Sequence, residues 1–215
     1  TALLSMSRNG IARMPCNPSI GGIAKAQLVF EIDILGGEMA RNTDYTGIQF
    51  RTLNTRRGPA VQSNRAQCDK RRYGRRMLAV LEKTEHLTII EAMVTGIATA
   101  NGRCQGVILS NGEKITATCV VLTPGTFLRG TIHIGDTRRP GGRDDAEAAT
   151  ELSQSLIDLG LRLARLKTGT PPRLSRDSID FGAMQEQHGE MPPPFFSWAA
   201  RREAALFHVE HGEST

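Results

Sequence analysis

Residues 94–126 read VTGIATANGRCQGVILSNGEKITATCVVLTPGT, and this stretch decides the fold class. Strand-like alternation of apolar and polar residues runs over 94–98, 105–110 and 113–123. Asn101-Gly102 and Asn111-Gly112 separate these runs. Asn-Gly is a strong hairpin signal, because a type I′ turn needs positive φ at two positions. The stretch therefore predicts an antiparallel meander, followed by an apolar strand at 119–122 and a sharp turn at Gly125.

Helical periodicity flanks the meander on both sides. It predicts three helices, over 23–35, 66–83 and 145–159. The apolar stripe of the first helix consists of Ala24, Leu28, Ile32 and Leu35. That of the second consists of Tyr73, Met77, Val80 and Leu81. That of the third consists of Leu152, Leu156 and Leu159, with Gly160 as its stop signal.

Short strands are expected at 2–5 and 87–91, and residues 43–64 read as an extended loop across a surface. A helix, a meander, an apolar strand and a glycine turn, in this order, are typical of a dinucleotide-binding α/β domain of the flavoprotein kind. However, the chain contains no G-x-G-x-x-G motif between a strand and a helix. Periodicity alone predicts only an α/β domain with a basic face.

The composition is that of a globular protein, with 39% hydrophobic and 23% charged residues among 215. No apolar run approaches the roughly 18 residues that a membrane-spanning helix needs, so we expect no membrane span. No signal peptide is recognisable, and none of the four cysteines forms a C-x-x-C pair. We therefore expect free thiols, no structural zinc and a cytoplasmic location.

The positive charge is concentrated in one window. The whole chain carries +5, whereas residues 51–76 carry nine basic residues against Asp69 alone, and so +8. Such a basic stripe is typical of a protein that binds a polyanion, with nucleic acid as the first candidate. The alternative is a solvated helix face beside a phosphate-facing loop.

Cys16 lies in a glycine-rich loop just before the first predicted helix. Unpaired N–H groups at a helix N-terminus lower the pKa of a nearby thiol, and they also hold a phosphate or the edge of a flavin. The alternative is that Cys16 is a small buried apolar residue. Cys68, Cys104 and Cys119 are expected to be structural, within a helix, at a hairpin and in a strand respectively.

Eight short segments resemble successive motifs of the MnmG (GidA) family, in the same order and at nearly constant spacing. They lie at 16–22, 47–51, 58–61, 65–67, 122–128, 132–135, 141–143 and 165–173. The family consists of flavin-dependent enzymes that, with an MnmE-type GTPase partner, add an aminomethyl or carboxymethylaminomethyl group to carbon 5 of the wobble uridine of tRNA. The resemblance extends from residue 2 to about 198.

The resemblance implies an α/β, Rossmann-like FAD/NAD(P)-binding flavoprotein domain with an antiparallel β-meander and the start of an inserted second domain. It also implies FAD and NADH as cofactors, methylenetetrahydrofolate as the one-carbon donor, and glycine or ammonium as the nitrogen source. tRNA is the implied substrate. A homodimer that joins the GTPase in a hetero-tetramer is the implied assembly of the complete enzyme.

The site residues follow from the same resemblance. Cys16 matches the first of two functionally important cysteines, placed beside the flavin, and is the implied catalytic residue. The implied cofactor-binding residues are Asn17, Gly21, Gly22, Val94, Gly125 and Ala149. The basic stripe supplies the candidate tRNA-binding residues, which are Arg51, Arg56, Arg57, Arg65, Lys70, Arg71, Arg72 and Arg75. No metal site is implied.

The family's glycine-rich FAD loop and second cysteine are expected outside this sequence, which then corresponds to an internal fragment. Residues 1–167 are expected to form a partial FAD-binding domain, and 168–215 the start of the inserted nucleotide-binding domain with a divergent tail. We expect the chain alone to hold FAD weakly and to be inactive. The alternatives are a relative of the folate-dependent tRNA uridine methyltransferases, a non-catalytic RNA-binding fragment, and a non-functional remnant.

Overall fold

The computed structural model describes residues 1–14, 17–142, 148–169, 171–172 and 174–202. They fall into two compact units, each built from segments distant in the sequence. One unit joins Thr1–Gly10 to Thr84–Thr168, and the other joins Ile11–Lys83 to the described residues from Gly169 onward. No helix among the described residues is long and apolar enough to cross a membrane.

The first unit contains the predicted meander. Strands β6 (Val94–Ala100), β7 (Arg103–Leu109) and β8 (Lys114–Thr116) pair antiparallel in this order. In a separate two-stranded sheet, β1 (Ala2–Ser5) pairs parallel with β5 (Thr88–Glu91). The period-two pattern predicts β5 and the three strands of the meander, although the last one is shorter than expected, and β1 was expected separately as a short strand; the structure confirms all five.

The two Asn-Gly turns of the meander differ in geometry. Asn101 and Gly102 both have positive φ, 52° and 71°, as a type I′ turn requires. In the second turn only Gly112 is left-handed, with φ 85°, and its N–H donates to the carbonyl of Leu109 at 2.9 Å. A type I turn followed by a left-handed glycine therefore closes the second hairpin, so the type I′ prediction is wrong there.

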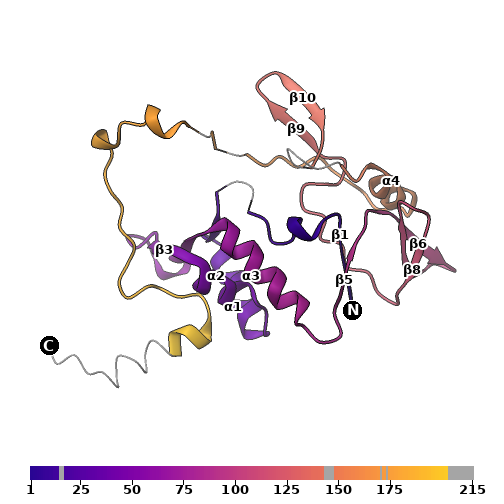
Figure 1. Ribbon diagram of the computed structural model, residues 1–215, viewed down its shortest axis with the longest axis horizontal. Coiled ribbons are helices and arrows are strands. Elements are labelled where there is room, and N and C mark those ends of the chain that lie inside the picture. The colour runs from indigo at the N-terminus through magenta and orange to yellow at the C-terminus, as the bar shows by residue number, and fades with distance from the viewer. Residues whose placement is uncertain (15–16, 143–147, 170, 173, 203–215) are drawn as a thin grey trace. The chain divides into compact units, whose positions relative to one another are not determined.

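Helix α4 (Thr150–Asp158) packs on β6, as Figure 1 shows. The hydroxyl of Ser155 accepts the N–H of Ile97 at 3.0 Å, and Leu152 and Leu156 are buried. Leu159 was expected in the same stripe but lies beyond the last helical residue, 42% exposed. Of the longer helix predicted here, residues 145–147 lie outside the described residues.

The apolar strand predicted at 119–122 does not form. Val121 in this segment is 85% exposed, although the segment is rich in β-branched residues. Among the described residues no other strand hydrogen-bonds to it, and an extended segment becomes a strand only when its N–H and C=O groups are paired. After the turn at Gly125, a hairpin of β9 (Thr131–Ile134) and β10 (Thr137–Pro140) follows, which the sequence did not predict.

The second unit is built on an antiparallel sheet in the order β2–β4–β3. Its strands are β2 (Ser19–Gly21), β3 (Gly47–Leu53) and β4 (Ser63–Cys68). The extended loop predicted for 43–64 is wrong, because β3 and the start of β4 occupy it. The β4 sequence SNRAQC is mostly polar, so its strand pairing leaves little trace in the hydropathy pattern.

Three helices pack in this second unit, as seen in Figure 1. They are α1 (Lys25–Ile34), α2 (Met39–Thr46) and α3 (Lys70–Glu82). Helix α3 begins four residues later than predicted, because the carboxylate of Asp69 accepts the N–H groups of Arg71 and Arg72 and so caps its first turn. Of its predicted apolar stripe, Tyr73 is buried and the other members are half-buried.

Helix α1 forms as predicted, but its buried face does not. The residues that face the core are Ala26, Val29 and Asp33, whereas the predicted stripe is exposed, with Leu35 at 88%. Apolar residues surround the whole helix, so their spacing does not identify one buried side. Ala26, fully buried, has the small side chain that close packing needs.

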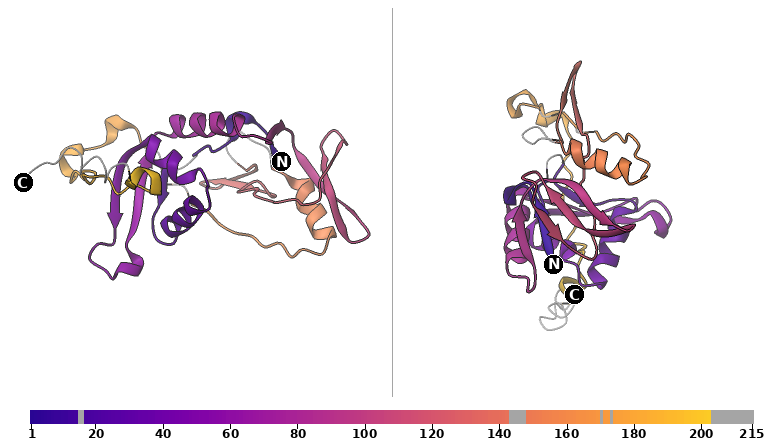
Figure 2. Two further views of the ribbon diagram at one scale, coloured as in Figure 1. Left: turned by 90° about the horizontal axis from the view of Figure 1, so that it is seen from below. Right: turned by 90° about the vertical axis from the view of Figure 1, so that its right-hand side faces the viewer.

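The described residues 187–201 run back across the second unit, as Figure 2 shows. The carboxylate of Glu190 accepts the N–H of Thr52 at 2.7 Å, and the side-chain amide of Asn64 donates to the carbonyl of Pro194 at 2.8 Å. Two single-turn helices precede this segment, η3 (Arg176–Ser178) and η4 (Phe181–Ala183); η1 (Arg8–Gly10) and η2 (Pro59–Val61) lie earlier. That 168–215 opens an inserted domain stays a prediction.

Candidate functional site

The glycine-rich stretch that runs from Asn17 through β2 to the start of α1 holds three of the residues that the resemblance assigns to the cofactor, Asn17, Gly21 and Gly22. Gly21 and Gly22 have φ of 97° and 91°, a backbone conformation that residues with a Cβ rarely adopt. Asn17 is exposed and lies just before β2. Cys16, the implied catalytic residue, lies outside the described residues.

The two glycines meet different surroundings. A Cβ on Gly21 would lie 2.1 Å from the carbonyl oxygen of Asn64 and 2.7 Å from the ring of Phe196, so Gly21 is required by close packing. A Cβ on Gly22 would meet nothing within 4 Å. The backbone of Gly22 therefore faces open space, where a ligand can approach it closely.

The N-terminus of α1 follows this loop directly. Ala24 at the N-cap position has φ 63°, and no side chain caps the helix. The side-chain carbonyl oxygen of Gln27 is buried without a hydrogen-bond partner among the described residues. A helix N-terminus without a side-chain cap, a glycine facing open space and an unpaired acceptor fit the polar edge of a flavin.

Two carboxylates fix the segment that packs against Gly21. Asp44 accepts the N–H groups of Phe196 and Ser197, each at 2.7 Å, and Asp33 accepts the N–H of Trp198 at 2.7 Å. Burial raises the pKa of the Asp44 carboxyl, and the N–H bonds from Phe196 and Ser197 oppose this rise without cancelling it. The ring of Phe196, 1% exposed, is thereby held on the glycine loop.

The remaining implied cofactor residues lie in the first unit. Ala149 is buried beside Leu152 and Leu156, and Val94 packs against the same cluster. The structure thus brings Val94 and Ala149 together. Gly125 lies in an exposed turn with φ 57°.

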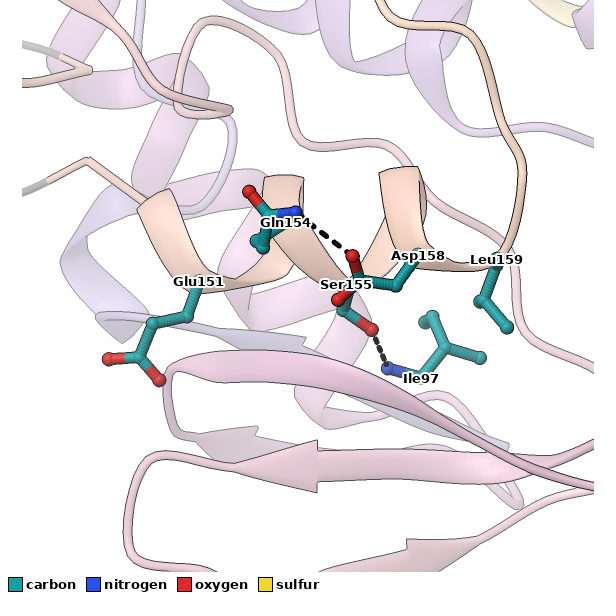
Figure 3. Close-up of a pocket in the computed structure, with 6 residues that line it drawn as sticks. All are labelled: Ile97, Glu151, Gln154, Ser155, Asp158 and Leu159. Carbon is teal, nitrogen blue, oxygen red and sulfur yellow. Dashed lines mark hydrogen bonds between the residues drawn. The ribbon is translucent and has the colours of Figure 1, made fainter.

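A hollow of about 440 Å³ opens beside this cluster, where α4 meets β6. Figure 3 shows the residues that line it, which are Ile97, Glu151, Gln154, Ser155, Asp158 and Leu159. None of the implied site residues is among them. Two carboxylates in the lining disfavour a phosphate-bearing ligand, because like charges repel.

The basic stripe divides into separate groups in the structure. Arg56 and Arg57 are exposed at the tip of the β3–β4 hairpin, which Figure 2 shows running away from α3. Lys70, Arg71, Arg72 and Arg75 are exposed on the first turns of α3. The six residues of β4 lie between these groups, which is roughly 20 Å of extended chain.

Arg51 and Arg65 lie opposite each other in the middle of the hairpin, half-buried. The guanidinium of Arg51 donates to the side-chain oxygen of Gln187 at 2.8 Å. Its Nε is buried without a partner among the described residues. Arg51 is therefore partly engaged in holding the 187–201 segment, and less free for a polyanion than the arginines of α3.

The three described cysteines are free thiols. Burial raises the pKa of Cys68 to about 11, so its thiol is protonated at neutral pH. Cys68 closes β4 and is structural, although in a strand and not in the predicted helix. Cys119 was expected in a buried strand but is exposed, because that strand does not form.

Sequence reasoning missed Tyr45, which is 68% exposed at the C-terminal end of α2. The guanidinium of Arg76 lies over its ring, 4.8 Å from the centroid. The sequence pattern predicts a loop over 43–64, so it gives no indication of a role for Tyr45. Asp33 and Asp44 were missed too, since their partners are distant backbone groups.

Comparison with known proteins identifies the family. Residues 1–208 match the model of the family described as "Glucose inhibited division protein A". This chain belongs to the GidA family. The match covers almost all of the chain, and so it agrees with the ordered motifs in the sequence.

Individual GidA relatives are similar over nearly the same range. The MnmG proteins of Geobacter sulfurreducens and Pelobacter propionicus, named tRNA uridine 5-carboxymethylaminomethyl modification enzymes, are 50% and 51% identical over 202 residues. In both cases the match covers 94% of this chain and 32% of the relative. The chain thus spans about a third of the length of these relatives.

The crystal structure of Aquifex aeolicus GidA is similar in fold as well, with a TM-score of 0.87 and 46% identity. It covers 94% of this chain and 34% of the GidA chain. The predicted fold class, part of a Rossmann-like α/β flavoprotein domain with an antiparallel meander, is confirmed.

Proposed function

We propose that this chain is part of an FAD-dependent enzyme that adds a carboxymethylaminomethyl or aminomethyl group to carbon 5 of the wobble uridine of tRNA. The observation that carries the proposal is the 50% identity over 202 residues to an MnmG protein with this named activity. As in the sequence-based expectation, NADH and methylenetetrahydrofolate are the further reactants, and an MnmE-type GTPase is the partner. We place the enzyme in the cytoplasm and expect it to be a homodimer.

In this proposal the glycine-rich loop holds the flavin edge. Gly22 allows close approach, the N-terminus of α1 has no side-chain cap, and the oxygen of Gln27 is an available acceptor. FAD supplies two-electron redox chemistry when it is bound. Val94, Gly125 and Ala149, in the first unit, are the proposed contacts to the nucleotide portion of FAD.

Cys16 is the proposed catalytic residue. It lies five residues before Gly21 in the sequence and matches the first of the family's two functionally important cysteines. In this proposal its thiolate, the reactive form of a cysteine, acts as the nucleophile of the modification reaction. The proposed contacts to tRNA are Lys70, Arg71, Arg72 and Arg75 of α3 and the hairpin residues Arg51, Arg56, Arg57 and Arg65.

The test substitutes Cys16→Ser in the complete protein that contains this chain, with Cys119→Ser as the matched control at an exposed thiol. We expect the Cys16→Ser protein to stay yellow with flavin but to lose modification of the wobble uridine, and the control to keep both. Full activity of Cys16→Ser would contradict the catalytic assignment.

A titration with FAD separates the enzyme from an RNA-binding fragment. The chain has no G-x-G-x-x-G loop for the pyrophosphate, so we expect the purified 215-residue chain to bind FAD weakly. Submicromolar binding would contradict that expectation. A complete protein that binds tRNA with a steep salt dependence and never binds flavin would support the non-catalytic alternative.

A further inference from the structure

A hollow lies between α2 and the start of α3 in the second unit. Its volume is about 340 Å³, and its lining residues are Tyr45, Thr46, Arg72, Arg75 and Arg76. Three guanidinium groups and one aromatic ring thus meet in one surface depression. Lys70 and Arg71, although basic and nearby in sequence, do not line it.

One of the three arginines is fixed in place by its neighbours. The guanidinium of Arg76 donates to the side-chain oxygen of Asn42 at 3.0 Å and pairs with the carboxylate of Glu38. Asn42 is fully buried, and its amide donates to the carbonyl of Tyr73 at 3.0 Å, which ties α2 to α3. Arg76 therefore acts as a rigid support beneath the ring of Tyr45, in cation–π contact with one of its faces.

The other two arginines are available to a ligand. Arg72 and Arg75 are exposed, and within the described part of the chain neither forms an ion pair with a carboxylate. The nearby carboxylate of Asp69 is occupied by the backbone N–H groups of the first helical turn. Two free guanidinium groups therefore border an exposed aromatic ring that is supported from one side.

We propose that this hollow binds a short stretch of single-stranded RNA, with one base stacked on Tyr45 and the flanking phosphates held by Arg72 and Arg75. Stacking platforms beside positive charge bind single strands because every base has a π-face and every nucleotide a phosphate. An acidic peptide needs the guanidinium groups but not the ring. The inference rests on the proposed function, for which it names a point of contact with unpaired nucleotides of tRNA.

The experiment measures binding of a fluorescein-labelled anticodon stem–loop RNA to the complete flavin-loaded protein by fluorescence anisotropy. We expect Tyr45→Ala to weaken binding about 5- to 150-fold, the range for loss of one stacked base, and Tyr45→Phe to retain it. The double variant Arg72→Gln/Arg75→Gln should make the salt dependence shallower by about 1.4, or about 0.7 for each phosphate contact. The charge-matched control is Arg103→Gln/Arg176→Gln, at exposed arginines elsewhere, and it should leave both quantities unchanged.

A second readout locates the contact. Photocrosslinking of the same RNA with 5-iodouridine in the loop should label Tyr45, and Tyr45→Ala should abolish this label.

The possible outcomes separate this inference from the proposed function. If the Tyr45 and arginine variants bind RNA and modify tRNA as well as the wild type does, this inference is overturned and the proposed function stays intact. Failure of the wild-type protein to bind the RNA would instead contradict the proposed function. Equal displacement of the RNA by a glutamate-rich peptide and by unlabelled RNA would overturn the assignment to RNA.

Discussion

The carboxylate of Asp44, near the end of α2, accepts the backbone N–H of Phe196 at 2.7 Å across 152 residues of sequence. The same carboxylate accepts the N–H of Ser197, so one side chain satisfies two consecutive donors. This pair of bonds positions the Phe196 ring on Gly21, in the loop that we propose to hold the flavin. The C-terminal segment thus contributes to the shape of a loop near the start of the chain.

Removal of this carboxylate should destabilise the second unit. In Asp44→Ala the buried N–H groups of Phe196 and Ser197 lose their acceptor, and we expect a loss of about 2 kcal/mol in the free energy of unfolding. Urea unfolding of the purified chain measures it. Asp180→Ala is the control, because that carboxylate also accepts two N–H groups but is exposed, and we expect it to cost no more than about 0.5 kcal/mol. Equal effects of the two substitutions would contradict the account.

The stability should also depend on pH through Asp44. Burial raises the pKa of this carboxyl in the folded protein above 3.8, its ordinary value, so the folded state holds the proton more tightly than the unfolded chain. The contribution of Asp44 to the free energy of unfolding therefore falls as pH rises from 3.8 through the raised pKa.

The free energy of unfolding of wild type minus that of Asp44→Asn, measured over a pH series, isolates the contribution of Asp44 from those of other groups. Asp69 acts with the opposite sign, because the N–H groups of Arg72 and Arg71 lower the pKa of its carboxyl, and its contribution is lost as pH falls. If this difference in unfolding free energy rose as pH increased above 3.8, the pKa of Asp44 would not be raised in the folded protein.

The two loop glycines should respond differently to alanine. Gly22→Ala adds only backbone strain at φ 91°, for which we expect about 1–2 kcal/mol of destabilisation. Gly21→Ala adds the same strain and forces Asn64 or Phe196 to move, so its effect should be larger. Thermal unfolding of both variants gives the comparison, and a milder effect at Gly21 would show that the Phe196 contact is not tight.

The thiols should differ sharply in reactivity. Cys119 is exposed, whereas Cys68 is 2% exposed and burial raises its pKa to about 11. Because the thiolate is the reactive form, iodoacetamide at neutral pH should label Cys119 in the folded chain and Cys68 only after unfolding. Mass spectrometry of the labelled peptides measures this, and rapid labelling of Cys68 in the folded chain would contradict its burial.

Local patterns in the sequence predict the local structure well. The Asn101-Gly102 turn and the Leu152–Leu156 spacing each follow from neighbouring residues, and the structure confirms both. The predictions that were wrong concern segments whose structure depends on pairing with other strands. Strand β4 is polar and forms through pairing with β2 and β3, while 119–122 is apolar and has no strand partner among the described residues.

In the candidate site too, features set by neighbouring residues were predictable from the sequence, and features set by distant residues were not. The glycine loop was evident in the sequence because positive φ restricts residue choice. The roles of Asp44 and Tyr45 were not evident in the sequence. The role of Asp44 depends on Phe196, which is distant in the sequence, and that of Tyr45 depends on the packing of α2 against α3. The charge pattern alone identified the basic stripe. Only the structure shows that β4 divides it into a group at the hairpin tip and a group on α3.

The most direct measurement is the nucleoside composition of tRNA from cells that lack the gene for the protein containing this chain. Mass spectrometry of digested tRNA quantifies the modified wobble uridine. We predict that the carboxymethylaminomethyl and aminomethyl groups at carbon 5 disappear, return with the wild-type gene, and stay absent with Cys16→Ser. Unchanged levels of these groups without the gene would contradict the assignment of this chain to a wobble-uridine-modifying enzyme.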